Sequence, residues 1–136
     1  MASKFLLEIV TPDRLFYNEE VDMTIVRTGD GDVGIMPDHI KMVSEISVGR
    51  IKIKKEGQIS EAAIAGGFIK VGLDKTTILT DAAEWPDEID PERAEAAKKR
   101  AEERLQNRGK GINLARAEIA LNKAINRMQV YQTLKK

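Results

Sequence analysis

The first part of the chain, up to about residue 84, contains short stretches in which apolar and polar residues alternate. In one of them Ile51 and Ile53 fall on one face, with lysines on the other. Alternation with a period of two is typical of β-strands. The stretches are residues 4–10, 21–28, 49–57 and 58–81, and the last predicts two or three strands with breaks at Gly66-Gly67 and at residues 73–75. Many short strands separated by turn residues indicate an all-β sandwich or barrel.

The apolar positions recur at steps of three and four after residue 88. One set is Ala94, Ala97, Ala101 and Leu105, and the next is Leu114, Ala117, Leu121, Ala124, Met128 and Tyr131. These steps predict two helices, separated by a break at Asn107 to Gly111. The narrow, alanine-rich faces let two helix backbones approach closely, but they bury little area. We therefore expect an antiparallel helical hairpin that is less stable than the sandwich and able to leave it.

Together these patterns predict an α+β fold in which residues 1–84 form an N-terminal all-β sandwich or barrel and residues 88–136 form a C-terminal antiparallel two-helix hairpin. The two parts differ in charge, although the whole chain carries no net charge. Residues 1–84 contain 10 Lys and Arg against 14 Asp and Glu, a balance of −4, and residues 85–136 contain 12 against 8, a balance of +4. The second part is thus suited to an acidic partner or to a phosphate group.

The composition excludes several classes of site. The chain has no cysteine, which excludes disulfides, thiolate zinc sites and cysteine nucleophiles, and the single histidine, His39, predicts a structural role and no metal centre. Residues 29–34 (GDGDVG) match the spacing of a dinucleotide-binding loop, but Pro37 prevents the helix that must follow, so we expect a turn between strands. The longest apolar run, residues 62–69, is too short to span a membrane, and the N-terminus does not read as a signal peptide; we expect a soluble cytoplasmic protein.

The start of the first predicted helix combines two signals. Asp90 can accept hydrogen bonds from the unpaired N–H groups of the first turn, and Pro91 needs no acceptor there. The same exposed N–H groups and the positive end of the helix dipole can hold an anion. Arg100 of the first helix and Arg127 of the second could converge on such a group in an antiparallel hairpin, although composition alone favours a solvated charged face.

The order of these features resembles the epsilon subunit of bacterial F-type ATP synthase over nearly the whole chain. The motifs that carry the resemblance are EIVTPD (residues 8–13), GDGDVGIMPDH (29–39), AIAGGF (63–68), TILTDAAE (77–84) and IDPERA (89–94), followed by AEERL and LARAEIALNKAINRMQV. Each motif alone is weak, but five in this order are specific. The chain departs from the family at Asp38 and Lys41, where smaller residues are usual, and this puts local contacts with stalk partners in doubt.

The resemblance implies a non-catalytic subunit of the central stalk, peripheral on the cytoplasmic face of the bacterial cell membrane and not inserted in it. The sandwich would bind the gamma subunit and the c subunits of the rotor ring. The hairpin would either fold on the sandwich or extend toward the catalytic alpha and beta subunits. In the extended form it would restrain ATP hydrolysis, while the subunit as a whole couples the rotor to ATP synthesis driven by an ion gradient.

The resemblance also implies a regulatory ATP site, with no cofactor required. Carried over to this sequence, the residues that would surround the adenine are Glu84, Ile89, Asp90 and Ala94, and those that would serve structure and phosphates are Arg93, Arg100, Lys123 and Arg127. Lys123 stands where ATP-binding relatives have arginine. Because lysine lacks the planar, two-pronged donor of arginine, the affinity for ATP is expected to be lower.

Two alternatives remain open from the sequence. The first is a free-standing nucleotide-sensing module that uses the same hairpin without a motor. The second is nucleic-acid binding through the basic hairpin, which fits less well because basic and aromatic residues do not interleave there. No nucleic acid is therefore expected as a partner.

Overall fold

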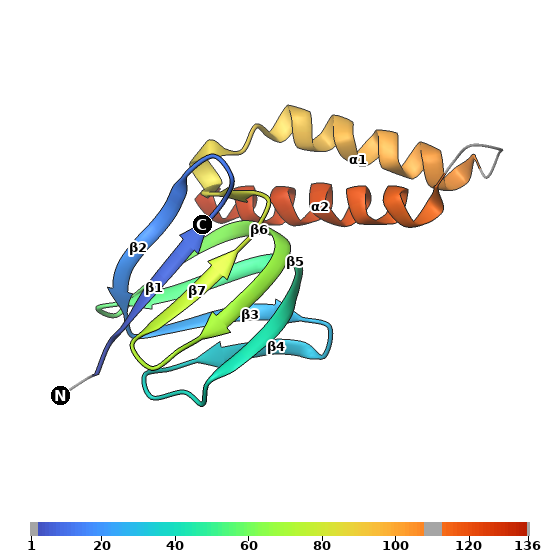
Figure 1. Cartoon of the computed structure of the whole chain (residues 1–136). Coiled ribbons are helices and arrows are strands. Elements are labelled where there is room, and N and C mark those ends of the chain that lie inside the picture. Colours follow the sequence, from blue (N-terminus) through green and yellow to red (C-terminus); the bar gives the residue numbers. More distant parts are fainter. Residues whose placement is uncertain (1–2, 108–112, 136) are drawn as a thin grey trace. The chain divides into compact units, whose positions relative to one another are not determined.

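The computed structural model describes residues 3–107 and 113–135 and divides into two compact units, Met1–Glu84 and Trp85–Lys136. The first unit is made of strands and the second of helices (Figure 1). The strands are β1 (Phe5–Val10), β2 (Leu15–Val21), β3 (Met23–Thr28), β4 (Gly31–Ile35), β5 (Met42–Lys55), β6 (Gln58–Val71), β7 (Lys75–Leu79) and β8 (Ala83–Glu84). The helices are the 3-10 helix η1 (Pro86–Glu88), α1 (Pro91–Gln106), α2 (Leu114–Gln132) and the 3-10 helix η2 (Thr133–Lys135). The predicted fold class is confirmed.

The strands form one sheet in the order β2-β1-β7-β6-β5-β3-β4, and β8 pairs with β6. Only β1 and β7 among the pairs described here run parallel. The long strands β5 and β6 curve strongly, which brings the two ends of the sheet around a shared core (Figure 1). The largest fully buried side chains of this core are Leu7, Ile9, Val21, Ile35, Ile51, Ile53, Ile69 and Ile78. Apolar residues on alternate positions therefore fill the interior, as the alternation in the sequence predicts.

Gly66 and Gly67 do not end a strand, so the break predicted there is wrong. β6 pairs with β5 in one register on both sides of these glycines, from Lys55↔Gln58 to Met42↔Val71. Both glycines have positive φ, 90° and 130°, which L side chains rarely adopt. They lie where β6 changes its other neighbour from β7 to β8. The glycines thus permit a change of partner within a continuous strand. The second predicted break is confirmed, because β6 ends at Val71 and β7 begins at Lys75.

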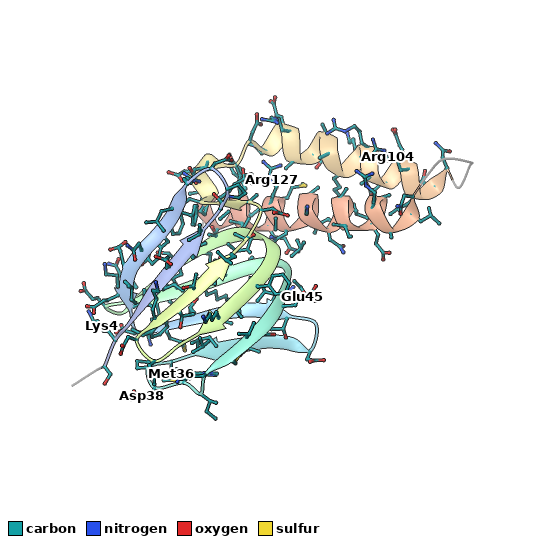
Figure 2. All side chains as sticks on the ribbon, viewed as in Figure 1. Lys4, Met36, Asp38, Glu45, Arg104 and Arg127 are labelled. Carbon is teal, nitrogen blue, oxygen red and sulfur yellow. The ribbon has the colours of Figure 1, made fainter. Side chains whose placement is uncertain are left out.

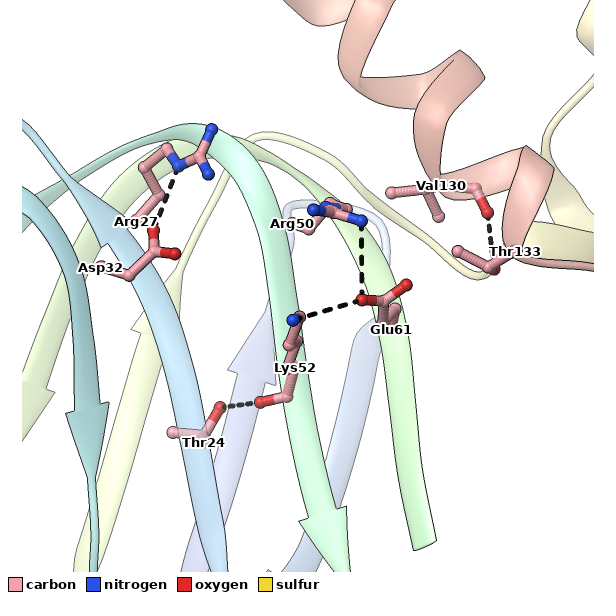
Figure 3. A network of polar contacts seen from close by, with 8 residues as sticks. All are labelled: Thr24, Arg27, Asp32, Arg50, Lys52, Glu61, Val130 and Thr133. Atoms are coloured by element: carbon pink, nitrogen blue, oxygen red, sulfur yellow. Dashed lines mark hydrogen bonds and ion pairs between the residues drawn. The ribbon is translucent and has the colours of Figure 1, made fainter. Parts of the chain in front are cut away.

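Polar contacts join neighbouring strands of the sandwich (Figure 3). The Thr24 hydroxyl donates to the Lys52 carbonyl at 2.9 Å, and the Glu61 carboxylate lies 3.7 Å from Arg50 and 3.9 Å from the Lys52 ammonium. Thr24 is fully buried, so its hydroxyl needs this partner. These contacts tie β3 and β6 to β5.

The predicted turn lies between β3 and β4 but is shorter than the GDGDVG segment: it consists of Gly29 and Asp30, and the rest of the segment is in β4. Thr28 pairs with Gly31 across this turn. After β4, Asp38 has a φ of 65°. This left-handed conformation favours glycine, and aspartate is among the few other residues that tolerate it. The departure from the family's usual small residue at this position is therefore compatible with the fold of the loop.

In the second unit α1 and α2 lie side by side and run in opposite directions (Figure 1). The buried alanines Ala94, Ala101, Ala117 and Ala124 confirm the predicted apolar seam. Asn126 and Val130 are also buried, although the predicted seam does not include them, and Leu114 of the predicted seam is 42% exposed. The Thr133 hydroxyl donates to the Val130 carbonyl at 2.7 Å and closes α2 (Figure 3). The predicted break begins at Asn107, which caps α1; residues 108–112 lie outside the described residues.

Candidate functional site

Asp90 is the N-terminal cap of α1, as predicted. Its Oδ1 atom accepts hydrogen bonds from the backbone N–H groups of Glu92 at 3.0 Å and Arg93 at 3.3 Å. Asp90 has the extended backbone typical of a cap, and Pro91 occupies the first helical position. Because both bonds use Oδ1, Oδ2 of this exposed carboxylate can still accept a hydrogen bond from a ligand.

Two residues expected beside the adenine, Ile89 and Ala94, are buried, with 4% and 0% of their surface exposed. The Ile89 N–H donates to the Pro86 carbonyl at 3.3 Å, and the Ala94 N–H donates to the Asp90 carbonyl at 3.1 Å. A ligand at the exposed side of this turn would therefore reach Asp90 before it reached either apolar side chain.

The basic residues of the proposed site come from both helices. Arg93 and Arg100 are exposed on α1, whereas Lys123 and Arg127 on α2 are partly buried. In Figure 2 Arg127 lies toward the C-terminal end of α2, and Arg104 lies near the C-terminal end of α1. Antiparallel pairing puts Arg93 about level with Arg127, and Arg100 is about 10 Å further along the helix. Arg100 and Arg127 thus do not start from the same level along the hairpin.

Glu84, the remaining predicted ATP-site residue, belongs to the first unit. It lies in β8 opposite Ala63 of β6 and is partly buried. The other predicted residues all belong to the second unit.

A second surface, which the sequence reasoning did not single out, is an apolar patch on the outer face of the sandwich. We define the patch as Val43, Phe68, Leu73 and Leu79, which are 72%, 57%, 80% and 54% exposed. Phe68 of β6 lies opposite Leu79 of β7. A contiguous exposed apolar area of this kind marks an interaction surface more often than chance exposure does.

Two hollows flank the Phe68–Leu79 pair. One, of about 650 Å³, is lined by patch residues and by charged residues that include Lys70 and Lys75. At its rim the Lys75 ammonium lies 3.6 Å from the Glu8 carboxylate. The other, of about 410 Å³, lies toward Val10 and the turn that follows it. The patch thus combines an apolar centre with a charged rim, which is the usual anatomy of a protein–protein interface.

The sequence does contain a signal for this patch. Phe68 is followed by buried Ile69, and Leu79 is preceded by buried Ile78, so apolar residues point to both faces of β6 and β7. Strands with apolar residues on both faces are typical of sheets covered on both sides. In a single domain with one core, the second apolar face predicts a partner.

A second apolar area lies in the loop from Met36 to Lys41, which we term the end loop. Met36 is 58% and Ile40 is 83% exposed. Figure 2 shows Met36 and Asp38 at the same end of the sandwich. The backbone N–H of His39 donates to the Met36 carbonyl at 3.1 Å, and its Nδ1 lies 2.7 Å from the Ile40 carbonyl. Both contacts are local to the end loop, and the structural role expected for His39 stays a prediction.

Within residues 3–107 and 113–135, no three histidine, aspartate or glutamate side chains gather in a way that could bind a metal ion. No helix in these ranges is both long enough and apolar enough to cross a membrane.

The chain matches two family models, one for each part. Residues 4–86 match the model described as "ATP synthase, Delta/Epsilon chain, beta-sandwich domain". Residues 87–132 match the model described as "ATP synthase, Delta/Epsilon chain, long alpha-helix domain". Together the two matches cover nearly the whole chain.

Curated relatives and solved structures agree with this match. The chain is 59% identical to the ATP synthase epsilon chain of Alkaliphilus metalliredigens over 128 residues, which cover 94% of this chain and 96% of the relative. It is 48% identical to the ATP synthase epsilon chain of Bacillus velezensis over 124 residues, which cover 91% of this chain and 94% of the relative. A chain in the Euglena gracilis mitochondrial ATP synthase structure has the same fold, with a TM-score of 0.78 and 24% identity over 97% of this chain and 79% of that one. The chain therefore belongs to the delta/epsilon chain family of ATP synthase, among the bacterial epsilon chains.

Proposed function

We propose that the chain is a non-catalytic central-stalk subunit, peripheral at the cytoplasmic face of the bacterial membrane, that couples the rotor of ATP synthase to its catalytic head. One observation carries this proposal. The chain joins two different parts, a sandwich with exposed apolar surfaces and a separate helical unit whose net charge is +4. The same fold occurs in a Euglena gracilis mitochondrial complex that contains F1 and the c-ring, and in a Tetrahymena thermophila complex of the central stalk with the c-ring.

The sandwich is the anchoring part in this proposal. It has two exposed apolar areas, the patch around Phe68 and Leu79 and the end loop with Met36 and Ile40. Two such areas suit a subunit that binds the gamma subunit and the c subunits of the rotor ring together. Burial of the patch in the complex would remove its apolar surface from water, which is the main favourable term in stable association.

The hairpin is the regulatory part. Its excess of basic residues favours an acidic surface on the alpha and beta subunits, where the extended hairpin would restrain ATP hydrolysis. ATP bound at the start of α1 would favour the folded hairpin and so relieve the restraint, because a ligand shifts a population toward the state that it binds better. Asp90 would receive the adenine, and the arginines would contact the phosphates.

The direct test is to delete residues 88–136 and to reconstitute the ATP synthase with the shortened chain. The sandwich should still assemble in stoichiometric amount, and the rate of ATP hydrolysis should rise above that of the complex with the full chain. A chain that does not co-purify with any multi-subunit ATPase would overturn the stalk role and favour a free-standing nucleotide sensor. Assembly with an unchanged hydrolysis rate would leave the stalk role but contradict the restraint.

A further inference from the structure

The outer face of β5 carries basic residues at alternate positions. Ile51 and Ile53 of this strand are buried in the core. Because successive residues of a strand point to opposite faces, Arg50, Lys52 and Lys54 share the face that lies away from the core. Their side chains start about 7 Å apart, the distance between every second residue of a strand. β5 thus presents an evenly spaced series of positive charges.

Arg27 of β3 extends this series. Its side chain packs against β5 at Gly49, where an added side-chain carbon would lie 2.9 Å from the Cβ and 3.2 Å from the Cδ of Arg27. Glycine at this position therefore leaves room for the Arg27 stem. Figure 3 shows Arg50 and Lys52 along β5, with Arg27 where the strand bends. We term these residues the basic row: Arg27, Arg50, Lys52 and Lys54.

The acidic side chains nearby do not balance the basic row. The Asp32 carboxylate lies 3.1 Å from Arg27 Nε. The Glu61 carboxylate is shared, since it lies 3.7 Å from Arg50 and 3.9 Å from Lys52. Among the residues that the structure describes, these two carboxylates are the only ones that form ion pairs with the row, so four positive charges face two negative ones. This local excess lies within a part of the chain whose own balance is −4.

The basic row is accessible and keeps hydrogen-bond donors for another acceptor. The side chains of Arg27 and Lys52 are about half exposed, and Lys54 is exposed. The distances from Glu61 to Arg50 and to Lys52 exceed those of hydrogen bonds, and both basic groups carry several N–H donors. A further carboxylate can therefore approach the row and accept hydrogen bonds from it.

We propose that the basic row binds an extended acidic segment of a partner protein, with a carboxylate at every second residue. Alternate side chains of an extended segment repeat at about 7 Å, which matches the spacing along β5. Side chains on one face of a helix repeat at about 4.5 and 6 Å and would fall out of step along the row. Because each exposed ion pair contributes little, selectivity comes from several pairs in register. In the proposed function this partner is a neighbouring subunit, but the recognition itself does not depend on that function.

Titration of the free, full-length chain with two peptides of equal composition tests the spacing. In one peptide glutamate alternates with threonine, and in the other the glutamates form one block. Amide chemical shifts measured by NMR report both the affinity and the residues that respond. We expect the alternating peptide to bind about tenfold more tightly, with the largest shifts at residues 50–54. Binding should weaken as salt rises to about 0.5 M, because salt screens exposed charges.

Two double variants with the same loss of charge test the residues. Lys52→Gln with Lys54→Gln should weaken binding of the alternating peptide about tenfold, since two exposed ion pairs are lost. Lys41→Gln with Lys70→Gln is the matched control, because both lysines are exposed but lie outside the basic row, and its affinity should stay unchanged. Equal affinity for the two peptides, equal loss in the two double variants, or no binding at millimolar concentration would each overturn the proposal.

Crosslinking of the assembled complex with a carbodiimide identifies the partner. This reagent condenses a lysine amine with a contacting carboxylate to form an amide bond. We expect mass spectrometry to find Lys52 or Lys54 joined to an acidic residue of another subunit. Links from both lysines only to carboxylates of the same chain, such as Glu61, would overturn the proposal for the complex. The titration needs no assembled motor, so a failure of the stalk role would leave its outcome unaffected.

Discussion

Gly67 passes so close to Leu79 that a side-chain carbon at Gly67 would lie 1.9 Å from the Leu79 carbonyl oxygen. The same carbon would lie 3.0 Å from two further backbone atoms, the Leu79 carbonyl carbon and the Thr80 Cα. Because the obstacle is backbone and not a flexible side chain, it cannot move aside without breaking the pairing of β6 with β7. Only glycine fits at this crossing, where β6 exchanges one neighbouring strand for another.

This relationship predicts that Gly67→Ala destabilises the sandwich by about 3 kcal/mol or more, from the backbone clash together with the strain of a φ of 130°. Urea unfolding followed by circular dichroism measures the difference. Gly29→Ala is the matched control, because a carbon added at Gly29 meets no atom within 4 Å and its φ is not positive. A loss below 1 kcal/mol for Gly67→Ala would show that the strands separate easily at this point.

The proposed ATP site predicts that Asp90→Asn and Arg100→Ala both weaken ATP binding while leaving the helix content of the chain unchanged. Asparagine is a good helix cap, so Asp90→Asn should keep α1 intact. Arg100 is exposed, and its loss should weaken triphosphate binding by about 1.5–3 kcal/mol if it makes a charged hydrogen bond. Calorimetric titration with ATP measures both effects.

Arg104→Ala serves as the control for charge, because Arg104 lies on the same helix, in its last turn, away from Asp90. It should bind ATP as the wild type does. If the wild-type chain does not bind ATP at millimolar concentration, or if Asp90→Asn and Arg100→Ala bind it unchanged, Asp90 is a helix cap alone.

The apolar patch predicts that Phe68→Ser and Leu79→Ser each weaken binding to the isolated gamma subunit by about 2 kcal/mol, the typical cost at a residue central to an interface. The folded chain should tolerate both changes, because both side chains are more than half exposed. Titration of the purified gamma subunit measures the affinity. Ile59→Ser is the matched control, since Ile59 is 65% exposed but does not line either hollow. Equal affinities for all of these variants would place the gamma subunit on another surface.

The sequence by itself determined the features that depend on neighbours along the chain. The period of two in residues 49–57 specifies a strand, and the steps of three and four after residue 88 specify helices. Each pattern shows which side of a single element faces the core. Asp90 could be assigned as a helix cap because the N–H groups that donate to its side chain lie only two and three residues further along the chain. The same holds for the turn at Gly29 and Asp30.

The tertiary structure alone decided the features that depend on distant segments meeting. Gly66 and Gly67 were expected to end a strand. In the structure the backbone of Leu79 comes so close to Gly67 that β6 can continue through this point only with glycine there. The contact of Arg14 with Ala83 joins two ends of the first unit, and the exposed face of Phe68 follows from which strands lie on either side of β6. Such pairings are set by the register of the whole sheet. A shift of one residue in this register would turn Phe68 inward and Ile69 outward. The sequence around a single strand does not specify the register.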